Sequence, residues 1–237
     1  MYLFPAIDIL DGAAVRLYKG DYAQKTVYSE NPASVAADFA ALGAKFIHTV
    51  DLGGAKTGGT PAFDSVLKIK ETSGAFVEIG GGIRNMQVVE KYLGAGLDRV
   101  ILGTAAVEDP EFRKAAADKY GDRIAVGMDL KDGFVAVRGW TEKSQLDAFT
   151  FCDTLVREGI STVICTDISK DGAMAGTNRE LYRELTKKFR INVVASGGVS
   201  SLDDVEYLAS MGLYGAIIGK AYYTGDIDLK KALEVAG

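Results

Sequence analysis

The chain repeats itself, and this internal repeat limits the folds that it can adopt. The segment FVEIGGGIR (residues 76–84) matches NVVASGGVS (192–200), and VILGTA (100–105) matches AIIGKA (216–221) at the same offset. Earlier in each half, AID and DG (6–8 and 11–12) match GMD and DG (127–129 and 132–133), and HTVD (48–51) matches ICTD (164–167). This self-similarity predicts one structural unit used twice, in halves of about 1–121 and 122–237.

Each half contains four short apolar runs, and an amphipathic run follows most of them. The apolar runs predict strands buried on both faces, at residues 3–9, 45–51, 75–79, 99–102, 124–129, 162–166, 192–195 and 215–218. The amphipathic runs predict helices at 33–42, 63–73, 87–93, 111–120, 145–157, 179–188, 202–209 and 229–235, with caps expected at Asn31, Asp109 and Asn178. Eight strand–helix units in series favour parallel pairing, and eight strands close a barrel. The predicted fold is therefore α/β, a single (β/α)8 TIM barrel over residues 1–237 built from two duplicated half-barrels.

Composition limits the partners and the compartment of the chain. The net charge is −5, so no broad basic face for nucleic acid is expected. Cys152 and Cys165 have no metal-ligand spacing and are predicted to be free thiols in a reducing compartment. The first residues read as a strand and not as a signal peptide, and no run is apolar enough to span a bilayer. We expect a cytoplasmic protein with no nucleic-acid or membrane partner, and a monomer because a closed barrel leaves no sheet edge.

Two matched sets of glycines end neighbouring strands, one set in each half. The first is Gly81, Gly82 and Gly103, followed by Thr104, and the second is Gly197, Gly198 and Gly219, followed by Lys220. Glycine lets backbone N–H groups turn toward an oxyanion, and a helix that begins after each set favours an anion. These glycines could instead serve only as tight turns. Because the set is duplicated in register, it predicts two phosphate cradles and an elongated substrate with a phosphate at each end.

Carboxylates stand between the predicted cradles. Asp8 and Asp129 end strands at equivalent places in the two halves, so both should point into the barrel mouth. A base and an acid that face each other across a substrate suit a proton-transfer isomerisation, although both could be structural. Thr166 could hydrogen-bond a catalytic carboxylate. Asp171, in the loop after the sixth strand, could serve as the acid in place of Asp129, or could only form a loop turn.

Three loops look long enough to act as lids, at residues 16–31, 131–144 and 169–178. The second carries Arg138 and Trp140, the only tryptophan of the chain. The indole could stack on a flat heterocycle with Arg138 near an anion, or it could anchor its own loop. The other candidate cations are Arg16, Lys19 and Arg84, for which surface ion pairing is the alternative.

His48 is the only histidine of the chain. Side chains alternate between the two faces of a strand, so His48 and Asp51 lie on opposite faces. We expect His48 to face the helix layer as a packed structural residue. A single histidine also rules out a multi-histidine metal site, so no metal is expected.

The motifs together resemble the phosphoribosylformimino-5-aminoimidazole carboxamide ribotide isomerase family, which acts at the fourth step of histidine biosynthesis. The resemblance rests on PAID, DG, VRL and KGD (5–8, 11–12, 15–17 and 19–21), HTVDL (48–52), GGGIR (80–84), TDISKDG (166–172) and ASGGV (195–199), and it covers nearly the whole chain. It implies a duplicated half-barrel, an Amadori rearrangement of an aminoaldose to an aminoketose, and no metal or organic cofactor.

The resemblance also implies roles for single residues. Asp8 matches the residue that takes the proton from ribose C2′, and Asp129 the donor to the ring oxygen, a role also proposed for the position of Asp171. The glycine sets with Thr104 and Lys220 match the two phosphate sites, and Trp140 the aromatic that stacks on the substrate. Gly53 departs from the pattern, because an acidic residue is usual there.

Other functions remain open at this point. Relatives of this family also isomerise phosphoribosylanthranilate, and the segment RGW (138–140) suits either substrate. A non-catalytic sugar-phosphate-binding barrel is a further alternative. A Schiff-base aldolase would need a lysine in a strand interior, which the predicted strands do not contain.

Overall fold

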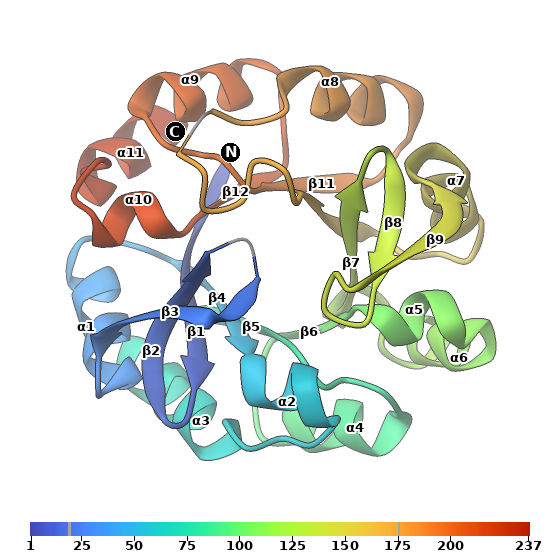
Figure 1. Ribbon diagram of the computed structural model, residues 1–237, viewed down its shortest axis with the longest axis horizontal. Coiled ribbons are helices and arrows are strands. Elements are labelled where there is room, and N and C mark those ends of the chain that lie inside the picture. Colours follow the sequence, from blue (N-terminus) through green and yellow to red (C-terminus); the bar gives the residue numbers. More distant parts are fainter. Residues whose placement is uncertain (19, 175) are drawn as a thin grey trace.

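The eight predicted strands close into a ring in the computed structural model, which describes residues 1–18, 20–174 and 176–237. Within these residues the ring consists of β1 (Tyr2–Leu10), β4 (Phe46–Asp51), β5 (Phe76–Gly80), β6 (Arg99–Leu102), β7 (Ile124–Lys131), β10 (Thr162–Asp167), β11 (Asn192–Ser196) and β12 (Gly215–Ile218). Each is hydrogen-bonded to parallel neighbours in this order, and β12 pairs with β1 to close the ring. Figure 1 looks down this ring. The fold is the predicted (β/α)8 barrel.

Helices cover the outside of the ring (Figure 1). They are α1 (Pro32–Ala41), α3 (Phe63–Ser73), α4 (Met86–Gly94), α6 (Pro110–Tyr120), α7 (Ala148–Arg157), α8 (Arg179–Lys188), α9 (Leu202–Ser210) and α11 (Leu229–Ala236). The predicted caps are confirmed, since Asn31, Asp109 and Asn178 each accept a hydrogen bond from a backbone N–H of the first turn. Short helices that the sequence pattern did not reveal are α2 (Leu52–Thr57), α5 (Thr104–Glu108), α10 (Lys220–Tyr223) and the 3-10 turn η1 (Gly121–Arg123).

Two of the three expected loops are built largely from strands. After β1 the chain forms an antiparallel hairpin of β2 (Ala13–Tyr18) and β3 (Asp21–Ser29), and after β7 it forms β8 (Phe134–Val137) and β9 (Glu142–Asp147). The prediction that a helix begins at residue 145 was therefore wrong. Residues 142–147 pair with β8, and Asp147 caps α7, which begins at Ala148. The loop at 169–178 has no regular structure in its described part.

The two hairpins begin with the same local geometry. Asp11 and Asp132 both have a φ of 53°, and the glycines that follow, Gly12 and Gly133, have φ values of 81° and 82°. A positive φ is unusual for residues other than glycine, so the shared turn is a specific likeness between the two halves. The division of the domain near residue 121 stays a prediction.

The apolar core has two parts. The larger part lies between the strands and the helices, and a smaller cluster fills the barrel: Phe4, Ala6, Ile101, Ala125, Ile164, Val194 and Ile217. Both cysteines are buried as free thiols, as predicted. Among the described residues, no helix has the length and apolarity needed to cross a membrane.

Candidate active site

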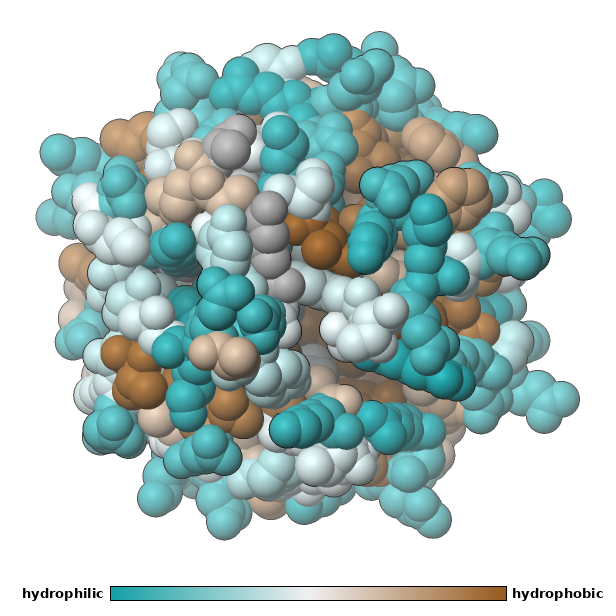
Figure 2. Space-filling view, in the orientation of Figure 1, coloured by the Kyte–Doolittle hydropathy of each residue, from teal (hydrophilic) through white to brown (hydrophobic). Residues whose placement is uncertain are grey.

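A cavity of about 1090 Å³ opens at the carboxyl ends of the barrel strands, where barrel enzymes bind their substrates. Figure 2 shows a hollow near the centre of this face. Its wall includes the described residues that the sequence singled out as catalytic or phosphate-binding: Asp8, Arg16, Gly81, Gly82, Arg84, Gly103, Thr104, Asp129, Arg138, Trp140, Thr166, Asp171, Gly197, Gly198, Gly219 and Lys220. Lys19 lies outside the described residues.

Asp8, at the end of β1, is paired with an arginine of the neighbouring hairpin. Arg16 Nη1 lies 2.9 Å from Asp8 Oδ2, and the two side chains are only 12% and 13% exposed. Burial raises the pKa of Asp8, the charge of Arg16 opposes that rise, and the charge of Asp171 adds to it. The guanidinium therefore favours the ionised form of Asp8, whereas burial favours the protonated form.

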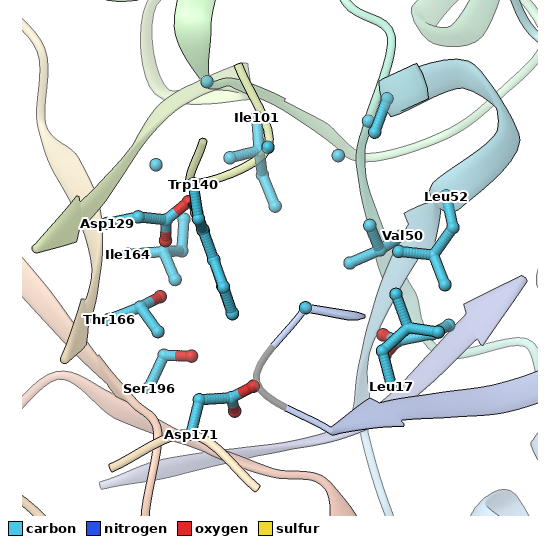
Figure 3. A pocket seen from close by; sticks show the side chains of 18 of the residues that line it. Leu17, Val50, Leu52, Ile101, Asp129, Trp140, Ile164, Thr166, Asp171 and Ser196 are labelled. Carbon is cyan, nitrogen blue, oxygen red and sulfur yellow. Dashed lines mark hydrogen bonds between the residues drawn. The ribbon is translucent and has the colours of Figure 1, made fainter. Parts of the chain in front are cut away.

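Asp129, at the corresponding place on β7, has neutral hydrogen-bond partners. Trp140 donates its indole Nε1–H to Asp129 Oδ2 at 2.8 Å. Burial raises the pKa of Asp129, and hydrogen bonds from Trp140 and Thr166 oppose that rise. Thr166 is the direct neighbour of Asp129 on the paired strand β10. Figure 3 shows Asp129, Trp140 and Thr166 on one side of the cavity and Leu17, Val50 and Leu52 on the other.

Asp171, in the loop after β10, comes close to the same arginine as Asp8. Arg16 Nη2 lies 3.8 Å from Asp171 Oδ1, so one guanidinium bridges two carboxylates that come from opposite halves of the chain. The structure thus brings all three predicted acid/base residues into one cavity.

The glycine turns make close backbone approaches that a side chain would prevent. At Gly82, with a φ of 77°, an added Cβ would lie 2.5 Å from the carbonyl oxygen of Gly59. At Gly198, with a φ of 83°, it would meet the carbonyl oxygen of Gly176. The two turns share a left-handed backbone that suits glycine, and each ends a strand at the cavity. The short helices α5 and α10 then begin at Thr104 and Lys220, beside the respective turns.

The cations around the cavity differ in how they are engaged. Arg16 lies against the second glycine set, because a Cβ on Gly219 would come within 2.6 Å of its Nη2. Lys220 Nζ donates to the carbonyl oxygen of Gly172 at 3.2 Å. Arg84 donates to the carbonyl oxygen of Ala55 at 3.0 Å.

Arg138 lines the cavity, but its guanidinium is engaged by protein carboxylates. Its guanidinium makes ion pairs of 3.0 Å with both Glu108 and Glu142, and the side chain is 58% exposed. Its backbone N–H donates to Thr104 Oγ1 at 2.8 Å. In this conformation Arg138 holds the loop beside the first glycine set, and two carboxylates engage its guanidinium.

The indole of Trp140 is turned into the cavity. Its backbone φ is 70°, and its ring packs so closely on Gly20 that a Cβ there would lie 2.7 Å from Cε3. The ring lies between the hairpin after β1 and Asp129. Figure 3 shows the indole of Trp140 next to Asp129. It is therefore placed to contact a ligand, and it also contacts the neighbouring hairpin.

The expected orientation of His48 was wrong. Asp51 faces the outer layer, where it accepts hydrogen bonds from the backbone N–H groups of Gly54 and Ala62. Strand alternation then turns His48 into the barrel, where it lines the cavity. The prediction had assumed that Asp51 faces inward. The departure from the family pattern at Gly53 lies in α2, where an added Cβ would meet Pro61 at 2.8 Å.

Sequence reasoning missed the residues that hold His48. Its Nδ1 lies 2.6 Å from Glu78 Oε1, and Glu78 is bound on its other oxygen by Arg99. Glu78 lies in the middle of β5 and Arg99 begins β6, and both strands are otherwise apolar. A charge in the interior of a doubly buried strand was the signal that could have revealed them, because buried charges are almost always paired.

Comparisons with known proteins find relatives of this chain over nearly its whole length. The family model described as "Histidine biosynthesis protein" matches residues 2–228. A protein of Lactococcus lactis subsp. cremoris (strain SK11) is 51% identical over 98% of this chain and 95% of its own length. A protein of Brachyspira hyodysenteriae is 47% identical over 100% of this chain and 99% of its own, and one of Listeria monocytogenes serovar 1/2a is 47% identical over 99% and 98%.

These relatives share one name, 1-(5-phosphoribosyl)-5-((5-phosphoribosylamino)methylideneamino) imidazole-4-carboxamide isomerase. Both the family model and the relatives span nearly the full chain, including the strand ends that build the cavity. The chain therefore belongs to the histidine biosynthesis protein family.

Proposed function

We propose that the chain is an aldose–ketose isomerase of histidine biosynthesis. It converts the aminoaldose named for its relatives, an imidazole-4-carboxamide with two 5-phosphoribosyl groups, to the corresponding aminoketose by an Amadori rearrangement. The observation that carries this proposal is the arrangement of the cavity. Carboxylates with different partners, Asp8 with Arg16 and Asp129 with Trp140, lie in one space between two matching glycine turns.

The two glycine sets are the proposed phosphate sites. One phosphate binds the turn of Gly81 and Gly82 with Gly103 and Thr104. The other binds Gly197 and Gly198 with Gly219 and Lys220, where Arg16 adds positive charge. A substrate with a phosphate at each end then spans the cavity, and its reacting sugar lies between the carboxylates. Arg84 and Arg138 would act through the loops that they hold, since both are engaged by protein atoms.

The reaction needs an acid first. Asp129 is our candidate, because burial raises its pKa and its partners are neutral donors. It protonates the ring oxygen of the ribosylamine, and the C1′–O bond breaks as the nitrogen lone pair forms a C1′=N double bond. Thr166 and Trp140 hold the carboxyl group for this step.

The second step needs a base. Asp8 is kept available as a carboxylate by the charge of Arg16. It removes the C2′ proton, and the electron pair of that bond forms the enolamine. Loss of the enol O–H proton and protonation at C1′ then give the C2′ ketone. Asp171 is the alternative acid, although it lies 3.8 Å from the arginine that it shares with the base.

Further features of the protein are part of the same proposal. We expect it to act without a metal or organic cofactor and without nucleic acid. We also expect a monomer, because each barrel strand is paired on both sides. A cytoplasmic location is proposed from the two free thiols.

An isomerisation assay with the aminoaldose, run in parallel with phosphoribosylanthranilate, tests the function. We expect turnover of the first substrate, and the second measures whether the chain is bifunctional. Inactivity on both would refute the proposal. A non-catalytic binding barrel would bind the aminoaldose without converting it.

A further inference from the structure

Three ionisable side chains form a connected row inside the barrel at the floor of the cavity. His48 on β4, Glu78 on β5 and Arg99 on β6 occupy directly paired positions of neighbouring strands. Arg99 donates Nε–H and Nη2–H to Glu78 Oε2 at 2.8 and 2.5 Å, and His48 Nδ1 lies 2.6 Å from Glu78 Oε1. Glu78 is fully buried and the Arg99 side chain is 3% exposed. Of the three, His48 is the one that lines the cavity.

The partners of Glu78 fix which nitrogen of His48 carries a proton. Burial opposes ionisation of Glu78, but the hydrogen bond from His48 and the charge of Arg99 outweigh it, so the pKa of Glu78 lies below its ordinary value. An ionised carboxylate only accepts hydrogen bonds, and Nδ1 must therefore be the donor. In the neutral ring Nε2 then carries a free lone pair. No group within residues 1–18, 20–174 and 176–237 hydrogen-bonds to Nε2.

His48 lines the same cavity as both proposed catalytic groups, Asp8 on β1 and Asp129 on β7. Its Nδ1 contacts Glu78 on β5, and Arg99 on β6 binds Glu78 in turn. The free nitrogen therefore belongs to the part of the cavity where the reacting sugar must lie. An ionised phosphate offers only acceptors, whereas a sugar hydroxyl offers the donor that a free lone pair requires.

We propose that His48 is a substrate-binding residue whose Nε2 accepts a hydrogen bond from a hydroxyl group of the reacting phosphoribosyl unit, with Glu78 and Arg99 as positioning residues that fix the ring. This inference rests on the proposed function, because it requires a sugar between Asp8 and Asp129. The competing role is structural: His48 would serve only as a hydrogen-bond donor to the buried carboxylate of Glu78.

Two substitutions of His48 separate these roles. In His48→Asn the amide can still donate to Glu78, but no atom remains at the position of Nε2. In His48→Gln an amide atom can reach the position of Nε2, while the contact with Glu78 is lost. As a matched control, Thr49→Val removes a buried hydrogen bond of 2.6 Å to the carbonyl oxygen of Glu78 on the face of β4 that does not line the cavity.

The kinetic outcome is specific. We expect His48→Asn to melt close to the wild type and to lose about tenfold or more in kcat/KM, as loss of a partner for a substrate hydroxyl should cause. His48→Gln should retain a higher kcat/KM than His48→Asn, and Thr49→Val should keep wild-type kinetics. A His48→Asn variant that turns over like the wild type, or one more active than His48→Gln, would overturn the proposal.

Nuclear magnetic resonance tests the same contact without relying on a His48 variant. Because the chain has a single histidine, an untagged protein labelled with 15N-histidine gives one set of ring signals. We expect a proton on Nδ1, and a shift of the Nε2 resonance when the aminoaldose binds to Asp8→Asn protein. An Nδ1 without a proton, or an Nε2 resonance that does not respond to the substrate, would contradict the proposal.

Failure of this inference can be told from failure of the function. If the wild type does not isomerise the aminoaldose, the proposed function is wrong. If the wild type is active and the histidine tests fail, only the role of His48 is wrong.

Discussion

Replacing Trp140 by phenylalanine should separate the two roles of this side chain. The substitution keeps an aromatic ring in the cavity but removes the indole N–H that Asp129 accepts at 2.8 Å. Burial raises the pKa of Asp129, and this hydrogen bond opposes the rise because it favours the charged form. Without it the pKa must move further up, so the carboxyl group stays protonated to higher pH.

The size of the effect follows from the strength of the lost bond. A hydrogen bond to a charged group contributes about 1.5–3 kcal/mol, and water that enters the partly exposed site offsets part of it. The carboxyl group also loses one of the two side-chain donors that hold it. Small displacements of a catalytic group cost up to about a hundredfold in rate, so we expect kcat/KM to fall by about tenfold to a hundredfold.

The assay is the pH dependence of kcat/KM, whose alkaline limb reports the acid of the free enzyme. We expect that limb to move to higher pH in Trp140→Phe. The matched control is Thr141→Val, which removes a loop hydrogen bond of 2.8 Å to the Arg138 carbonyl oxygen and leaves the partners of Asp129 intact. An alkaline limb that stays in place, or moves to lower pH, would refute Asp129 as the acid.

Further predictions follow from the same geometry. Asp8→Asn should lower kcat by about a hundredfold or more while the aminoaldose still binds, and isothermal calorimetry beside a turnover assay measures both. Thr166→Val should shift the alkaline limb in the same direction as Trp140→Phe, because Thr166 also lowers the pKa of Asp129; a shift to lower pH would count against the proposed contact. Gly82→Ala should destabilise the fold by about 1–3 kcal/mol, since its Cβ would meet a carbonyl oxygen at 2.5 Å, whereas Gly103→Ala has open space and should melt like the wild type. Glu78→Gln should cost about 3–5 kcal/mol at neutral pH by leaving a buried charge unpaired. Because the folded-state pKa of Glu78 is depressed, its contribution to stability is present above the ordinary pKa of 4.5 and is lost as the pH falls through the lower folded-state pKa. Urea unfolding should therefore show a smaller gap between wild type and Glu78→Gln in acid, and an equal gap at every pH would contradict the buried ion pair.

The barrel could be predicted from sequence because its determinants are local and periodic. Short apolar runs and capped amphipathic runs alternate eight times, and parallel strands in series have few ways to close. The matched glycines at residues 81–82 and 197–198 also located both sides of the cavity, since a left-handed backbone requires glycine wherever it occurs.

The hairpins after β1 and β7 could not be predicted as the barrel strands were. Their outer strands β3 and β9 are polar and partly exposed, so they lack the apolar alternation that indicates a strand. Pairing with β2 and β8 creates them, and that pairing depends on the turns that begin at Asp11 and Asp132.

The inward turn of His48 was missed for a different reason. Strand alternation tells which residues share a face, but not which face points into the barrel. The wrong assumption that Asp51 faces inward therefore placed His48 on the outside. The inward face of β4 is defined by the fold, in which Glu78 and Arg99 occupy the positions paired with His48 on the next two strands.

Substrate carrying deuterium at C2′ provides the most direct test of the proposed chemistry. The account predicts that the wild-type enzyme forms the aminoketose and that C2′ deuteration lowers its kcat/KM. It also predicts that Asp8→Asn leaves the deuterium on C2′ of the substrate. Release of the C2′ deuterium by Asp8→Asn at the wild-type rate would contradict proton abstraction by Asp8.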